Sequence, residues 1–181
     1  MSESSAPDPK LLACLARLKS GDTSAQGELI ELTQNRLYRF ALYLSGNREL
    51  AQDLCQDCYM KVFKAIESME NPARFFSWLF RIAKNQFLDH CDSAGRQAPS
   101  FKEDLAKSFE DTPSGEDIEL MIGVRAALTE LEPEDRLLVL SVDLEGLSYA
   151  EAAELLGISE AAVRSRLHRA RQLLVKIMEK P

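Results

Sequence analysis

Residues 148–178 place the strongest constraint on the fold, because they read as two short helices joined by a glycine turn. Ser148 and Glu151 stand in the spacing of a capping box, which predicts the start of a helix. Gly157 supplies the permissive backbone of a tight turn, and Ser159 can cap the second helix. Apolar residues then recur at three- and four-residue steps, at Ala162, Val163, Leu167, Ala170, Leu174 and Ile177. This layout predicts a helix-turn-helix, which makes DNA the leading ligand.

The second of these helices also concentrates positive charge, at Arg164, Arg166, Arg169 and Arg171. The apolar face is expected to be buried, so the arginines are expected to form an exposed cationic stripe. Residues 159–181 hold six Lys or Arg against two Asp or Glu, whereas the rest of the chain holds sixteen against twenty-seven. Because the whole chain has a net charge of -7, we expect DNA contacts to be confined to local patches and to weaken with salt.

Helical spacing persists along the chain and strand-like alternation does not, so the sequence predicts an all-α protein. A stretch rich in Gly, Pro, Ser and acidic residues predicts a flexible acidic linker over 93–120. We therefore expect one helical domain over 9–92 and a helix-turn-helix domain over 121–181. The chain has no apolar run long enough to span a bilayer and no hydrophobic stretch near its start, which predicts a cytoplasmic protein without membrane insertion.

The first domain is expected to contain four helices, over residues 9–20, 23–44, 48–66 and 75–90, with a loop over 67–73. The fourth helix interleaves aromatic and basic residues, an arrangement that holds single-stranded or flipped bases in other proteins. Most of the aromatic residues, Trp78 foremost, are nevertheless expected to pack in a helix-bundle core. The polar set of Arg81, Lys84 and Asn85 has no such explanation.

Three segments together resemble the extracytoplasmic-function (group 4) subfamily of bacterial RNA polymerase sigma factors. They are ELAQDLCQD over 49–57, FSWLFRIAKN over 76–85, and LSYAEAA over 147–153 with VRSRLHRAR over 163–171. The resemblance covers nearly the whole chain outside the linker. It implies two helical domains that bind core RNA polymerase and direct it to promoters, and an anti-sigma factor as regulator.

The resemblance also implies residue roles in three groups. Contact with the polymerase is expected from Asp53, Gln56 and Asp57. Capture of the single-stranded minus-10 element is expected from Arg74, Phe76, Trp78, Arg81, Lys84 and Asn85. Recognition of the minus-35 duplex in the major groove is expected from Arg164, Ser165, Arg166, His168, Arg169 and Arg171. No metal, cofactor or catalytic residue is expected.

Two other interpretations remain open at this point. Cys55 and Cys58, with His90 and Cys91, are residue types that could bind zinc or act in redox chemistry, although they lie inside predicted helices without the turn residues of a zinc site. A stand-alone helix-turn-helix regulator would explain the basic helix, but not the acidic third helix or the aromatic fourth one. The sequence has neither a phosphate-binding glycine loop nor a nucleophile with a base, which argues against an enzyme.

Overall fold

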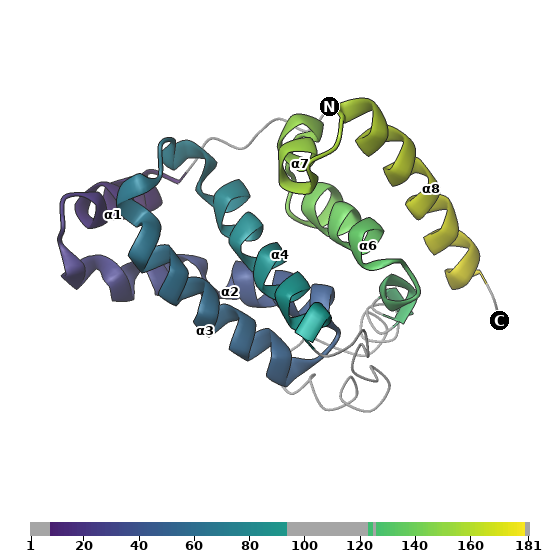
Figure 1. Ribbon diagram of the computed structural model, residues 1–181, viewed down its shortest axis with the longest axis horizontal. Coiled ribbons are helices and arrows are strands. Elements are labelled where there is room, and N and C mark those ends of the chain that lie inside the picture. The colour runs from purple at the N-terminus through teal and green to yellow at the C-terminus, as the bar shows by residue number, and fades with distance from the viewer. Residues whose placement is uncertain (1–7, 94–122, 125, 180–181) are drawn as a thin grey trace.

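The computed structural model describes residues 8–93, 123–124 and 126–179, and every element in that part of the chain is helical (Figure 1). The all-α expectation is therefore confirmed, whereas most of the predicted linker lies outside the described residues. The first half contains α1 (Pro9–Lys19), η1 (Thr23–Ala25), α2 (Gln26–Ser45), α3 (Arg48–Ala65), η2 (Ile66–Ser68), η3 (Pro72–Arg74) and α4 (Phe75–Ser93). The second half contains α6 (Pro133–Val139), the π-helical turn η5 (Leu140–Leu144), α7 (Tyr149–Leu156) and α8 (Glu160–Met178).

Short polar side chains set the helix boundaries of the first half. Asp8 caps α1, Asn47 caps α3, and each accepts a hydrogen bond from a backbone N–H of the first turn. Gly46 ends α2 in the left-handed conformation, with φ 67°. The single helix predicted over 23–44 begins instead with the separate 3-10 turn η1, because the side chain of Asp22 accepts hydrogen bonds at that turn and not at the start of α2.

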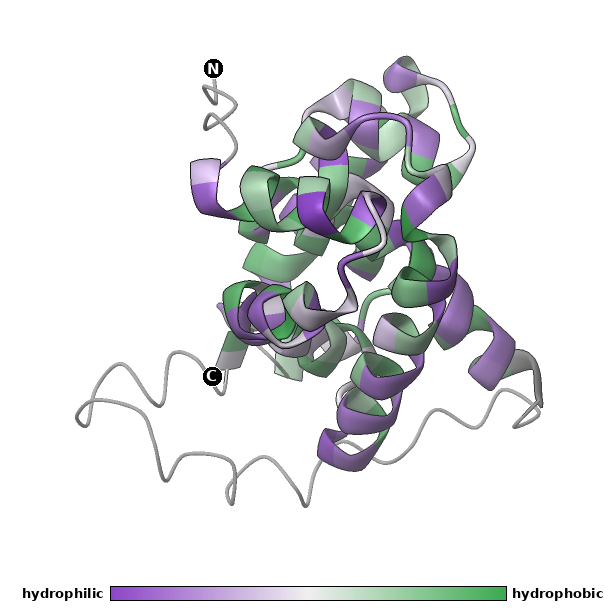
Figure 2. Ribbon diagram, turned by 90° about the vertical axis from the view of Figure 1, so that its left-hand side faces the viewer, coloured by the Kyte–Doolittle hydropathy of each residue, from purple (hydrophilic) through white to green (hydrophobic). Residues whose placement is uncertain are grey.

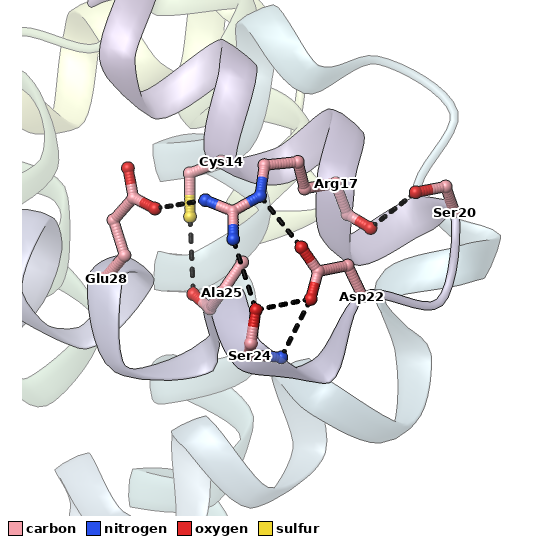
Figure 3. A network of polar contacts seen from close by, with 7 residues as sticks. All are labelled: Cys14, Arg17, Ser20, Asp22, Ser24, Ala25 and Glu28. Atoms are coloured by element: carbon pink, nitrogen blue, oxygen red, sulfur yellow. Dashed lines mark hydrogen bonds and ion pairs between the residues drawn. The ribbon is translucent and has the colours of Figure 1, made fainter.

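The corner between α1 and α2 is held by the guanidinium of Arg17 (Figure 3). Its Nε donates to Asp22 at 2.8 Å, and its Nη1 donates to Glu28 at 2.7 Å. Its Nη2 donates to the hydroxyl of Ser24 at 3.2 Å. All of these groups are exposed, so the network fixes the geometry of the corner and adds only modestly to stability.

The helices pack around one continuous hydrophobic core that includes residues from both halves of the chain. In Figure 1, α4 lies between α3 on one side and α6 and α7 on the other, with α8 on the far side of α6 and α7. Figure 2 shows hydrophobic and hydrophilic residues on different sides of the helices, as expected for amphipathic helices around a core. Fully buried large side chains are Phe40, Phe75, Phe80, Leu15, Leu29, Leu37, Leu44 and Leu79 in the first half, and Leu138, Leu140, Leu155 and Leu167 in the second. The two predicted domains are thus in direct contact.

Candidate nucleic-acid interface

The helix-turn-helix forms with the local contacts that its sequence predicts. The hydroxyl of Ser148 accepts a hydrogen bond from the backbone N–H of Glu151 at 3.2 Å, and the Glu151 carboxylate accepts one from the N–H of Ser148 at 2.9 Å. Gly157 ends α7 with φ 69°, and Ser159 caps α8 by accepting from the N–H of Ala162 at 3.2 Å. The capping box, the turn and the second cap are therefore all confirmed.

Helix α8 buries one face and leaves the opposite face exposed. Val163, Leu167 and Ala170 are buried, as the spacing predicts. Leu174 and Ile177 are only partly buried, because the C-terminal part of α8 extends beyond the helices that cover its first part. The exposed side carries Arg164, Ser165, His168, Arg169 and Arg171.

Two of the four arginines on α8 bind carboxylates of their own half of the chain. Arg166 donates to Asp135 and Glu134 of α6, each at 2.8 Å, and its side chain is 23% exposed. Arg171 pairs with Asp143 of η5, and this hydrogen bond raises the pKa of Arg171. The predicted cationic stripe therefore consists of two arginines in ion pairs and two outside them. Among the described residues, Arg164 and Arg169 form no ion pair, whereas Arg166 and Arg171 tie α8 to its neighbours.

A pocket of about 400 Å³ lies at the start of α4. From the first half of the chain it is lined by Ser68, Met69, Glu70, Asn71, Arg74, Ser77, Trp78 and Arg81. The expected core position of Trp78 is therefore only partly correct, because its ring is half-buried and one side faces the pocket. Glu154 of α7 lines the same pocket from the second half of the chain.

The remaining predicted residues of α4 do not line this pocket. Phe76 is half-buried beneath the guanidinium of Arg36, whose central carbon lies 3.7 Å from the ring centroid. Lys84 donates from Nζ to the backbone carbonyl of Leu155 in α7 at 3.0 Å. Asn85 is exposed and lies one turn beyond Arg81 on α4. The structure thus brings Arg74, Trp78 and Arg81 together, and leaves Phe76, Lys84 and Asn85 outside the pocket.

The acidic group on α3 forms a separate exposed surface. Asp53, Gln56 and Asp57 are all exposed, and they line a depression of about 320 Å³ together with Gln86 and His90 of α4. Leu50 and Leu54 also line this depression and belong to the hydrophobic core. The helix therefore presents its carboxylates to solvent while its apolar face holds it against α4.

Comparison with known proteins decides between the interpretations of this fold. Residues 29–97 match the family described as Sigma-70 region 2, and residues 122–174 match the family described as Sigma-70, region 4. The chain belongs to the extracytoplasmic-function sigma factors. The expected family and the expected function in transcription initiation are thereby confirmed.

Individual relatives agree with this assignment. SigE of Mycolicibacterium smegmatis is 39% identical over 163 residues, a match that covers 86% of this chain and 63% of SigE. SigM of Mycobacterium tuberculosis is 33% identical over 164 residues, covering 91% of this chain and 82% of SigM. Among solved structures, the sigma factor RpoE in complex with the anti-sigma factor NepR from Bartonella quintana is similar with a TM-score of 0.69 at 25% identity, over 84% of this chain and 96% of that one.

The region 2 match argues against a stand-alone helix-turn-helix regulator, because it accounts for the helices that this alternative left unexplained. Extracytoplasmic-function sigma factors are not known as enzymes. No described helix of this sigma factor has the length and apolar character needed to cross a membrane.

The cysteines of the sigma factor behave as packing groups in the described part of the chain. Cys58 is buried and Cys55 is half-buried, and burial raises the pKa of each thiol to about 12. Both are therefore protonated near neutral pH, whereas metal binding and thiol exchange need the thiolate. No group of three or more His, Cys, Asp or Glu that could hold a metal ion is found among the described residues.

Several charged residues at the contact between the two halves of this sigma factor could not be recognised from sequence. Glu145 has a fully buried side chain paired with Arg36 and Arg39 of α2. Arg136 is 7% exposed and donates hydrogen bonds to the backbone carbonyls of Leu44, Leu128, Thr129 and Leu131. Each stands in a sequence context typical of an exposed helix or turn, so the sequence carries no signal for its burial.

Proposed function

We propose that this sigma factor binds core RNA polymerase through α3, captures a single-stranded promoter element on α4 and binds promoter duplex with α8. The observation that carries the proposal is the pocket on α4, which is lined by the half-buried indole of Trp78 and by the guanidinium groups of Arg74 and Arg81. This combination of an aromatic surface and cations suits an unstacked base with its flanking phosphates. The factor acts by binding and performs no catalysis of its own.

Polymerase binding is assigned to the exposed surface formed by Asp53, Gln56 and Asp57. Two carboxylates on adjacent turns of α3 give this surface a negative potential, which suits a basic partner surface. The same face carries the exposed side chain of Met60, which adds apolar area at its end. Because the partner is the polymerase, the proposed site of action is the cytoplasm.

Minus-10 capture is assigned to the pocket and to the turn of α4 that follows it. A base extruded from the duplex would stack on Trp78, and its phosphates would lie against Arg74 and Arg81. Unstacking a base costs a few kcal/mol, and this binding would offset it. Lys84 and Asn85 would continue the surface toward the next nucleotides, whereas Phe76 packs under Arg36 of α2.

Minus-35 binding is assigned to the exposed face of α8. Arg164, Ser165, His168 and Arg169 project from the helix and can reach base edges or phosphates in a major groove. Arg166 and Arg171 contribute through the ion pairs that orient α8 against α6 and η5. An anti-sigma factor is the proposed regulator, supported by the similarity to RpoE, which was solved in complex with NepR.

The test is retention of purified bacterial core RNA polymerase on the immobilised full-length chain. The Asp53→Ala/Asp57→Ala variant removes both carboxylates of the proposed contact, and we expect it to retain much less polymerase than the wild type. Glu31→Ala/Glu67→Ala is the matched control, because it removes two exposed carboxylates that lie outside α3. Circular dichroism of all three proteins verifies that the helices are intact.

Retention by the wild type and the control, with loss in the double variant, would support the assignment of α3. Equal retention by all three proteins would place the polymerase contact elsewhere on the chain. Absence of retention by the folded wild type would overturn the proposal that the chain binds polymerase unaided.

A further inference from the structure

One wall of the pocket on α4 is formed by residues 68–71, which run from the end of η2 to the start of η3 and which we call the pocket loop. All four residues line the pocket. The side chain of Met69 is buried, whereas Ser68, Glu70 and Asn71 are exposed. Stacking on an indole accepts any base, but polar side chains in a pocket can bind the edge of one base in preference to others. The position of the pocket loop therefore affects which bases the proposed site prefers.

The hydrogen bonds within the pocket loop and its flanking turns are short in range. The hydroxyl of Ser68 donates to the carbonyl of Ala65 at 2.7 Å, and the backbone N–H of Met69 donates to the carbonyl of Ile66 at 3.2 Å. The side chain of Asn71 accepts from a backbone N–H two residues further on, at 3.0 Å. Such bonds define local turns, but they do not fix the position of the loop relative to the other helices.

Lys19, the last residue of α1, connects the pocket loop to a different helix. Its Nζ donates to the backbone carbonyl of Met69 at 2.5 Å, across a separation of 50 residues in the chain. The side chain of Lys19 is half-buried, so this contact is partly shielded from water. Because the donor is a charged ammonium group, the hydrogen bond is stronger than one between neutral groups. The bond is therefore suited to hold the loop backbone at a set distance from α1.

Packing on both sides of this hydrogen bond keeps α1 and the loop together. The side chain of Met69 is 3% exposed and belongs to the hydrophobic core, as do Leu15 and Leu18 of α1. Helix α1 contacts both η2 and η3, the two turns that flank the loop (Figure 1). Two residues before Lys19, Arg17 ties the last turn of α1 to a carboxylate of α2 (Figure 3). Lys19 therefore reaches the loop from a helix end that is itself held in place.

We propose that Lys19 is a positioning residue, which holds the pocket loop through the Met69 carbonyl and thereby sets the base preference of the pocket on α4. The inference rests on the proposed function of that pocket. Lys19 itself does not line the pocket, so it acts through the loop. Arg74 and Arg81 supply cations for phosphates whatever the base, so overall affinity and base preference are separable quantities. Helix α1 also precedes the match to region 2, which begins at residue 29.

The test compares the full-length wild type with Lys19→Met, which keeps an apolar side chain of similar length and removes the ammonium group. Lys19→Arg is the conservative variant, because a guanidinium can also donate to the carbonyl. Lys10→Met is the matched control, because it removes the same charge from an exposed position in the first turn of α1. Circular dichroism verifies that all four proteins are folded.

Trp78 is the only tryptophan of the chain and lines the pocket, so quenching of its fluorescence reports occupation of the pocket. Each protein is titrated with single-stranded oligo-dA, oligo-dC and oligo-dT of equal length. The ratio of the weakest to the tightest Kd measures base preference, whereas the mean affinity measures phosphate binding.

We expect the ratio to fall about fivefold in Lys19→Met, as for the loss of one hydrogen bond to a base edge, and to be kept in Lys19→Arg and Lys10→Met. A ratio unchanged in Lys19→Met, or a wild type that binds the three oligonucleotides equally, would overturn the role of Lys19 and leave the pocket as a base site. An equal fall in Lys10→Met would assign the effect to net charge and overturn it too. Absence of quenching in the wild type would instead overturn the pocket as a base site, and with it the inference.

Discussion

Helices α4 and α8 carry the two proposed DNA surfaces, and they differ in where their cations find partners. On α4, Arg74, Arg81 and Lys84 all bind groups of α7, in the other half of the chain. On α8, Arg166 and Arg171 bind carboxylates of their own half. The α4 surface therefore depends on the relative position of the two halves, whereas the α8 surface does not.

This difference has a functional consequence for the isolated chain. The pocket on α4 is lined in part by Glu154 of α7, while Arg164 and Arg169 on α8 are exposed. Duplex binding and single-strand binding are thus expected to respond differently to changes at the contact between the halves. Variants of α4, of α8 and of the contact between the halves test this difference.

The largest effect is expected at Arg136, which belongs to the contact itself. Its guanidinium is buried and donates to the carbonyls of Leu44 and Leu128, each at 2.8 Å, and to two further carbonyls nearby. Arg136→Ala removes the hydrogen bonds to these carbonyls and opens a cavity, so we expect a loss of roughly 3 kcal/mol in the free energy of unfolding, measured by urea denaturation. Arg39→Ala removes a half-exposed guanidinium from the same contact, and we expect a loss of less than about 1 kcal/mol. Similar losses in both variants would contradict the special position of Arg136.

The next largest effect is expected on α8, where Arg169 and Arg166 should affect different properties. Arg169→Ala is expected to weaken binding of a minus-35 duplex by about 1 to 3 kcal/mol if Arg169 reads a base, with no change in stability. Arg166→Ala removes the ion pairs to Glu134 and Asp135, so it is expected to lower stability by up to about 1 kcal/mol. Anisotropy titrations and urea denaturation measure the two quantities. A stable Arg166→Ala protein with the larger loss of DNA affinity would reverse the roles of the two arginines.

A smaller effect is expected at Asn85, which is exposed on α4 next to the contact with α7. Asn85→Ala removes a single polar contact to the unwound strand, worth about 1 kcal/mol, and should impair open-complex formation. Duplex binding should be unchanged, because α8 is not altered. Permanganate reactivity of promoter thymines in the assembled holoenzyme reports opening. Equal losses in opening and duplex binding would show that the two helices do not act separately.

The smallest effect is a pH dependence at the α4–α7 contact. Burial raises the pKa of Glu151, but hydrogen bonds from Ser77 and Ser148 and the charge of Arg74 outweigh it and leave the pKa below the ordinary 4.5. A lowered carboxyl pKa adds stability that is present above about pH 4.5 and is lost as the pH falls through the lowered value. We therefore expect urea denaturation to show a loss of stability in that acidic range. Ser77→Ala removes the hydrogen bond across the contact and should reduce the dependence; an unchanged profile would exclude Glu151 as its source.

Local sequence was sufficient for much of the fold. The capping box at Ser148, the left-handed Gly157 and the cap at Ser159 each act within a few residues, so their pattern predicted the helix-turn-helix correctly. Asp53 and Asp57 are exposed on α3, as charged residues of an amphipathic helix generally are. The start of α2 was predicted incorrectly, because the hydrogen bonds at Asp22 favour a separate 3-10 turn before the helix.

Long side chains were the main source of error at the candidate site. Arg166 was expected on an exposed stripe but is only 23% exposed, whereas Arg171 is exposed as expected but pairs with Asp143. A flexible arginine can bind any carboxylate within reach, and spacing along one helix does not reveal such partners. Trp78 was assigned foremost to the core, but its half-buried position depends on the loop and on α7, which lie beside it only in the folded chain.

The sequence by itself determined the helical class, the helix-turn-helix and the family, because these depend on short-range periodicity, capping and motif order. Only the tertiary structure decided that the two halves share one core, that Glu145 is buried between Arg36 and Arg39, and that α7 lies over the pocket on α4. Each of these features joins residues from the two halves of the chain, such as Arg36 and Glu145. A contact across that separation depends on how whole helices pack, which local spacing does not encode.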